Sequence, residues 1–121
     1  MSTNAPSPIR GDELLRARLA ALSKLSDSAL ITCDLEGNVL DWNPAAETIF
    51  GHTAAEMIGQ PLTMIVPEDL LEKEVHILNR VANNEAVPRF ETARLSKTRG
   101  LVEVSVSVTP LCDGDGRVAG H

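Results

Sequence analysis

The sequence predicts an α+β fold, in which an antiparallel sheet of about five strands carries short helices over one face and is preceded by an amphipathic helix. Two observations support this prediction. Residues 34–51 combine a turn, a strand and a capped helix in one short stretch, and residues 102–108 alternate valine with polar residues. Such brief helices need a sheet to pack on. Valines at a period of two supply the buried face of that sheet.

The N-terminal part divides into two segments. Residues 1–10 are rich in proline and serine and lack hydrophobic periodicity, which predicts a disordered leader. In residues 11–26, Leu15, Leu19 and Leu22 follow one another at spacings of four and three. This spacing predicts an amphipathic helix. Its leucine stripe packs either on the sheet of its own chain or against a second copy.

A β-hairpin is predicted next. Two short apolar runs, residues 29–33 and 39–42, flank a turn in which Gly37 and Asn38 tolerate positive φ. Each run is the length of a short strand. The pair therefore forms the first hairpin of the predicted sheet.

Three helices follow, each with a start signal. Asn43 precedes Pro44 and is the expected cap of the first, while Thr53 and Glu56 have the spacing of a capping box that opens the second. Asp69, three residues before another glutamate, is expected to cap a longer helix that ends near residue 83. The predicted buried face of that helix consists of Leu70, Leu71, Val75, Leu78 and Val81.

The last third is predicted to be β. Residues 89–95 and 101–111 form two strands, and the valines at 102, 104, 106 and 108 give the second strand one apolar face. Pro110 ends the pairing, and residues 113–116 make a turn. Only residues 117–121 remain for a last strand.

Several linked motifs in residues 27–121 together resemble a PAS domain. They are the run Asp-x-x-Gly-x-Val-x-x-Trp-Asn-Pro-Ala-Ala-Glu-x-x-Phe-Gly at 34–51, then Glu56–Gly59, Ile65–Asp69, Phe90–Arg94, Val104–Pro110 and Asp113–Val118. A set of motifs in order is far more specific than any one of them. In that family the last strand is long and lies between the first and fourth strands. The resemblance therefore implies that residues 117–121 pair only partially and that the chain is a fragment of a longer signalling protein.

The resemblance also implies a function. PAS domains are regulatory sensor and dimerisation modules of signal transduction, including two-component and phosphorelay proteins, and they commonly act on a kinase or similar effector in the same longer protein. Helices that flank such domains often pair in a homodimer, so Leu15, Leu19 and Leu22 become the expected dimer interface. A pure protein-interaction scaffold is an alternative function.

The expected place for a ligand pocket is between the valine face and the helices. The apolar residues on the inward faces of these elements are Ile49, Phe50, Ile58, Leu62, Ile65, Val75, Leu78, Phe90, Val104 and Val106. An apolar interior without convergent polar groups tends to close. Ordinary core packing is therefore the favoured interpretation over a bound small ligand.

A haem- or flavin-bearing redox or gas sensor is the main alternative function. His76 lies on the helix where haem-binding relatives place their iron ligand, but the matching position here is Glu74, so His76 is expected to be an ordinary histidine. Residues 60–65 lack the cysteine of a flavin-cysteinyl photosensor. A flavin bound without a covalent bond near Trp42 stays open. No cofactor and no metal are predicted.

Composition limits the remaining functions. The chain of 121 residues has a net charge of −6 and no cluster of lysine or arginine, which disfavours nucleic-acid and membrane surfaces as partners. It shows neither a spanning segment nor a signal peptide, so a cytoplasmic location is expected. Cys33 and Cys112 are predicted to be reduced. No catalytic constellation is recognisable, so we expect no enzymatic activity.

Overall fold

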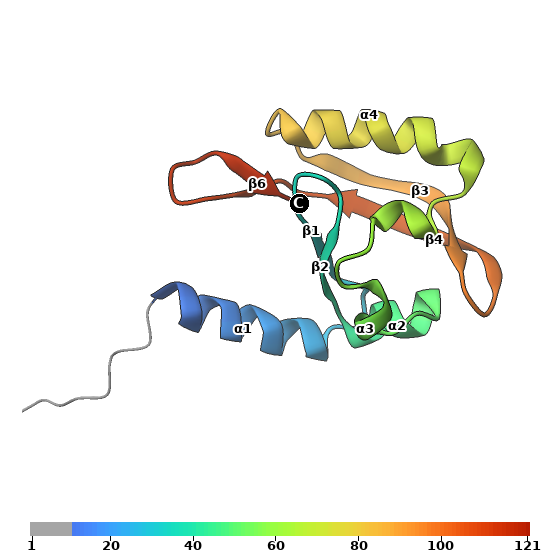
Figure 1. Cartoon of the computed structure of the whole chain (residues 1–121), viewed down its shortest axis with the longest axis horizontal. Coiled ribbons are helices and arrows are strands. Elements are labelled where there is room, and N and C mark those ends of the chain that lie inside the picture. Colours follow the sequence, from blue (N-terminus) through green and yellow to red (C-terminus); the bar gives the residue numbers. More distant parts are fainter. Residues whose placement is uncertain (1–10) are drawn as a thin grey trace, which may run out of the picture.

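The computed structural model describes residues 11–121, so the predicted leader at residues 1–10 lies outside the described residues. In chain order, the elements are α1 (Gly11–Leu25), β1 (Ile31–Cys33), β2 (Val39–Trp42), α2 (Pro44–Phe50), α3 (Ala54–Met57), the 3-10 helices η1 (Leu62–Ile65) and η2 (Glu68–Leu70), α4 (Leu71–Ala82), β3 (Val87–Ser96), β4 (Gly100–Val108), β5 (Leu111–Cys112) and β6 (Val118–Gly120). Figure 1 shows α4 lying along β3 and β4, with α1 on the opposite side of the strands.

All strand pairs are antiparallel, as predicted, but they form three two-stranded ladders: β1 with β2, β3 with β4 and β5 with β6. The end of β6 reaches β1, where the backbone N–H of Cys33 donates to His121 O at 2.7 Å and the N–H of His121 donates to Cys33 O at 3.0 Å. The expected partial pairing of the last segment is therefore confirmed. A three-residue strand can pair only a few backbone groups, so the ladders are not joined into one continuous sheet.

The apolar core lies beneath the β1–β2 hairpin and the short helices. It contains Cys33, Val39, Trp42, Ala46, Phe50, Met57 and Ile65. Val102 and Val104 of β4 pack against this cluster, and the alternating residues Glu103, Ser105 and Ser107 are exposed. The predicted division of β4 into an apolar and a solvated face is confirmed.

Asn43 joins three segments of the chain. Its Oδ1 accepts from Ala46 N at 3.0 Å, which is the predicted cap of α2, and also from Leu30 N at 2.9 Å. Its Nδ2 donates to the carbonyl oxygens of Ser23 and Ser28, both at 2.9 Å. A single buried side chain thus connects the end of α1, the approach to β1 and the start of α2.

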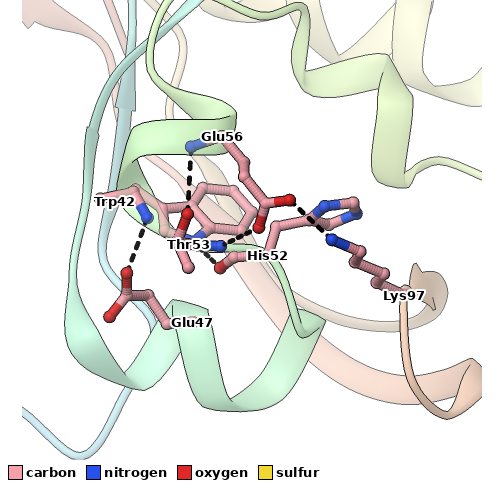
Figure 2. Close-up of polar contacts among 7 residues, drawn as sticks. Trp42, Glu47, His52, Thr53, Glu56 and Lys97 are labelled. Carbon is pink, nitrogen blue, oxygen red and sulfur yellow. Dashed lines mark hydrogen bonds and ion pairs between the residues drawn. The ribbon is translucent and has the colours of Figure 1, made fainter.

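The second predicted cap is also present. Thr53 Oγ1 accepts from Glu56 N at 3.2 Å, and Glu56 Oε1 accepts from Thr53 N at 2.8 Å. The other carboxylate oxygen of Glu56 accepts from Lys97 Nζ at 2.6 Å, which links α3 to the β3–β4 turn. Figure 2 shows this arrangement together with Trp42, whose Nε1 donates to His52 O at 3.0 Å.

The predicted start of the long helix is wrong. Asp69 lies inside η2, and α4 begins at Leu71 without a side-chain cap. Pro67 explains the difference, because Leu70 N donates to its carbonyl at 2.9 Å and closes a 3-10 turn before the α-helix starts. An N-cap needs an extended backbone, and Asp69 within this turn cannot supply one.

Candidate functional site

A groove of about 390 Å³ runs between α4 and β3. Its lining comprises Leu70, Lys73, Glu74, His76, Ile77, Arg80, Val87, Pro88, Arg89, Phe90, Glu91, Thr92 and Arg94. The volume lies at the lower end of the range of about 300–1,000 Å³ that is typical of small-molecule sites. Side chains from both walls combine apolar contact area with several charges, so the groove is the best candidate site in the described part of the chain.

A buried ion pair lies in this groove. Arg94 Nη2 donates to Glu74 Oε1 at 3.1 Å, and each side chain is only 8% exposed. Arg94 Nη1 also donates to Ala93 O at 2.8 Å and to Thr92 Oγ1 at 3.2 Å. The pair connects the first half of α4 to the last part of β3, and thereby fixes how the helix lies on the strand.

Burial shifts the pKa of both partners toward their neutral forms. It raises the pKa of the Glu74 carboxyl and lowers the pKa of the Arg94 guanidinium, while the charge of each partner offsets part of the shift of the other. The loss of hydration therefore outweighs the attraction within the pair.

The groove is positively charged although the chain is acidic. Four of its lining residues are Lys or Arg and two are Glu, a local net charge of +2 compared with −6 for the whole chain. Arg80 Nε pairs with Glu85 at 3.3 Å, whereas Lys73 and Arg89 have no ion-pair partner among residues 13–121. Unpaired cations beside apolar surface favour an anionic partner.

A second, smaller cavity of about 60 Å³ adjoins Glu74 on another side. It is lined by Glu36, Gly37, Pro61, Leu62, Thr63, Glu74, Leu78 and His121. Burial lowers the pKa of His121, whose buried Nε2 has no hydrogen-bond partner within the described residues. Burial, together with the carboxylates of Asp34 and Glu74, raises the pKa of the Cys33 thiol to about 12.

A known protein family matches most of this chain. The family described as PAS fold matches residues 23–121. The chain belongs to the PAS family. This confirms the resemblance found in the sequence, and PAS domains are sensory modules of signalling proteins.

Two relatives are similar to this chain, and one of them is described as a PAS domain. An uncharacterized protein of Azorhizobium caulinodans is 36% identical over 84 residues, which cover 59% of this chain and 11% of the relative. The PAS domain of a protein from Colwellia psychrerythraea has a TM-score of 0.76 and 26% identity, covering 88% of this chain and 90% of that one. The chain thus spans about a tenth of the length of the Azorhizobium relative.

More distant structures share the fold. A domain of a sensory box sensor histidine kinase/response regulator from Geobacter sulfurreducens has a TM-score of 0.67 at 20% identity, covering 92% of this chain and 95% of that one. An RNA-binding light-oxygen-voltage receptor has a TM-score of 0.73 at 20% identity, with 99% of this chain and 34% of that one covered. No helix within residues 11–121 is both long and apolar enough to cross a membrane.

Five of the ten residues of the predicted pocket belong to the core of this PAS domain or pack against it, and none of these five lines the groove. Phe50 and Ile65 are buried in the core, and Ile49, Leu62 and Val104 pack against it. Leu62 also lines the small cavity. At these five positions the side chains pack in the core, where the sequence allowed either a ligand pocket or ordinary packing.

The other five predicted pocket residues have different outcomes. Phe90 lines the groove, its pairing partner Val106 is half-buried, and Leu78 lines the small cavity. The prediction is wrong for Ile58, which is 50% exposed after the end of α3, and for Val75, which is 56% exposed. On α4, Glu74 and Val81 are buried, so the helix turns Val75 toward solvent.

Sequence reasoning missed the buried pair. Glu74 lies three residues before Ile77 and four before Leu78, on the apolar row of α4. Arg94 lies at an even spacing from Phe90, on the inward face of β3. A charge at an inward position of each element was the available signal. His76, by contrast, is an exposed residue of the groove lining.

Proposed function

We propose that this PAS domain is a regulatory sensor and dimerisation module in a signalling protein, and that it passes a change in helix or sheet packing to a kinase or similar effector. The fold likeness to a domain of a sensor histidine kinase/response regulator supports this proposal. The much greater length of the Azorhizobium relative supports a linked effector. The domain itself regulates and performs no catalysis, and its setting is the cytoplasm.

The exposed leucine face of α1 carries the proposal. Leu15, Leu19 and Leu22 are 57%, 57% and 64% exposed, although they form one stripe along the helix. Burying one such side chain is worth about 1.5–3 kcal/mol. A second copy of α1 covers this stripe in a homodimer, in the manner of a coiled coil.

The groove between α4 and β3 is the sensing site of the proposed module. Both walls belong to the part of the domain farthest from α1 in Figure 1, so the site stays open when the α1 helices pair. Its size suits a small molecule, and neither a cofactor nor a nucleic acid is needed for this function.

The experiment compares oligomeric states by native mass spectrometry and light scattering. We expect the wild-type chain to be a dimer and L15Q/L19Q/L22Q to be a monomer with an unchanged circular dichroism spectrum. The matched control E13Q/K24Q changes two exposed positions on the face of the same helix that points away from the leucine stripe, and it should remain a dimer. A monomeric wild-type chain, or a dimer that survives the leucine substitutions, would refute the proposal.

A flavin-bearing sensor is the second candidate, favoured by the fold likeness to light-oxygen-voltage receptors. The segment from Gln60 to Ile65 offers no cysteine for a covalent adduct, so the flavin would be bound without a covalent bond. A visible absorbance spectrum of the purified chain distinguishes the two functions, and it also detects haem. A dimer free of any bound small molecule would favour a scaffold.

A further inference from the structure

The groove between α4 and β3 has an apolar middle. Leu70 of η2 and Ile77 of α4 line the groove opposite Val87, Pro88 and Phe90 of β3. These side chains remove apolar surface from water when a hydrocarbon or aromatic body lies between them. The groove therefore suits a ligand whose body is apolar.

Positive charge lies at both ends of this apolar middle. Lys73 and Arg94 lie at one end and Arg89 lies toward the other, because α4 and β3 are connected by a short turn and run in opposite directions. Arginine and lysine side chains in a partly desolvated groove attract a carboxylate more strongly than they do at an open surface. The head group of the ligand is therefore anionic.

Arg94 has hydrogen-bonding capacity left. Its Nη2 makes one hydrogen bond, to Glu74 Oε1, and its Nε makes none to any residue in 13–121. A guanidinium binds a carboxylate best through two parallel N–H donors, and Nε with Nη2 forms such an edge. Glu74 engages only one of these two donors, so a ligand that engages both can replace it.

We propose that the groove binds a small organic carboxylate with an apolar body, and that its carboxylate takes the place of Glu74 on Arg94. This inference rests on the proposed sensor function and names its ligand class. Release of Glu74 breaks the buried connection between α4 and β3. Glu74 also lines the small cavity next to His121 and the β1–β2 turn, so the exchange alters the contacts at the end of β6.

The test measures binding of octanoate to the full chain by calorimetry, with octanol and octylammonium as probes of the same length. We expect saturable binding of octanoate, and weaker or no binding of the other two. E74Q keeps an oxygen that accepts from Arg94 but removes the competing charge. It should bind octanoate about tenfold more tightly than the wild type.

Two further variants complete the test. E74Q/R94M removes both charges, keeps the side-chain volumes similar, and should bind octanoate about tenfold to a hundredfold more weakly than E74Q. E72Q is the matched control, since it removes the same charge from an exposed position of α4 outside the groove. Its affinity should stay within about twofold of the wild type.

The outcomes separate this inference from the proposed function. Three results would overturn the carboxylate exchange: weaker octanoate binding by E74Q than by the wild type, octanol binding equal to octanoate binding, or no octanoate binding by either protein. If the same samples are dimeric, the proposed sensor and dimerisation module is not refuted by these results. Octanoate binding to a monomeric wild-type chain would instead support the exchange and refute dimerisation.

Discussion

The buried pair Glu74–Arg94 should cost the fold stability compared with an apolar pair of similar size. Three variants test this: E74L, R94M and the double variant E74L/R94M. Both charges are almost removed from water, with 8% of each side chain exposed, and burial shifts the pKa of both toward the neutral form. The attraction between the partners therefore does not recover the full cost of desolvation.

The expected magnitudes follow from this burial. Each single substitution leaves one buried charge without its partner and should lower the free energy of unfolding by about 3 kcal/mol, the lower end of the range for broken buried pairs, because the groove is open to solvent. That loss is a large part of the total stability of a domain, about 5–15 kcal/mol. The double variant should be as stable as the wild type or more stable by about 1–2 kcal/mol.

Urea unfolding followed by fluorescence measures these differences. Trp42 is the only tryptophan and is 5% exposed, so its emission reports the loss of the core. The pair Arg80–Glu85 is the matched control, because its N–O distance of 3.3 Å is similar while its side chains are 50% and 56% exposed. E85Q should lower the free energy of unfolding by less than about 1 kcal/mol. A double variant that loses as much stability as the two single variants together would refute the reasoning.

The pH dependence gives an independent check. The folded chain holds a proton on Glu74 more tightly than the unfolded chain does, since burial raises the pKa of this carboxyl in the fold. The contribution of protonated Glu74 to the free energy of unfolding is fully present below the pKa of this residue in the unfolded chain. It is lost as the pH rises through the pKa of Glu74 in the folded chain. The free energy of unfolding of the wild type, relative to E74L/R94M, should therefore fall with rising pH in that window, and a rise would contradict the assignment.

Two further predictions concern the caps and the thiols. In urea titrations, N43A should lower the free energy of unfolding by about 2 kcal/mol, which is the upper end for a lost cap, because Asn43 also bonds to α1 and to the approach to β1. T53A removes a cap alone and should lower it by about 1 kcal/mol. Equal losses would show that the bonds of Asn43 to α1 and β1 contribute nothing. Iodoacetamide should modify exposed Cys112 in the native chain and spare Cys33, whose thiol has its pKa raised to about 12. Mass spectrometry of the labelled peptides checks this, and equal labelling would contradict the burial of Cys33.

Local chemistry allowed much of this fold to be predicted from the sequence. The caps at Asn43 and Thr53 depend on residues within three positions, so their spacing alone was sufficient. The alternation of valines in β4 similarly depends on the strand itself. The structure confirms both predictions, because neither depends on residues that are distant in the sequence.

The start and rotation of α4 could not be predicted in the same way. Its apolar positions admit two overlapping stripes, one through Val75 and one through Glu74. Periodicity alone favoured the apolar residue. Arg94, twenty positions away on β3, decides in favour of Glu74, because it offers a buried carboxylate a partner.

The groove was missed for a related reason. Its two walls meet only after α4 has folded back along β3, and Phe90 is the one residue of its lining that the sequence placed in a pocket. A charged residue at an inward position was the one local sign of it. Such a residue is a poor choice for stability alone, because an apolar side chain packs there at lower cost. The ion pair is thus better explained by ligand binding in the groove. If E74L/R94M is as stable as the wild type but no longer binds a carboxylate, fold stability and ligand binding are separable.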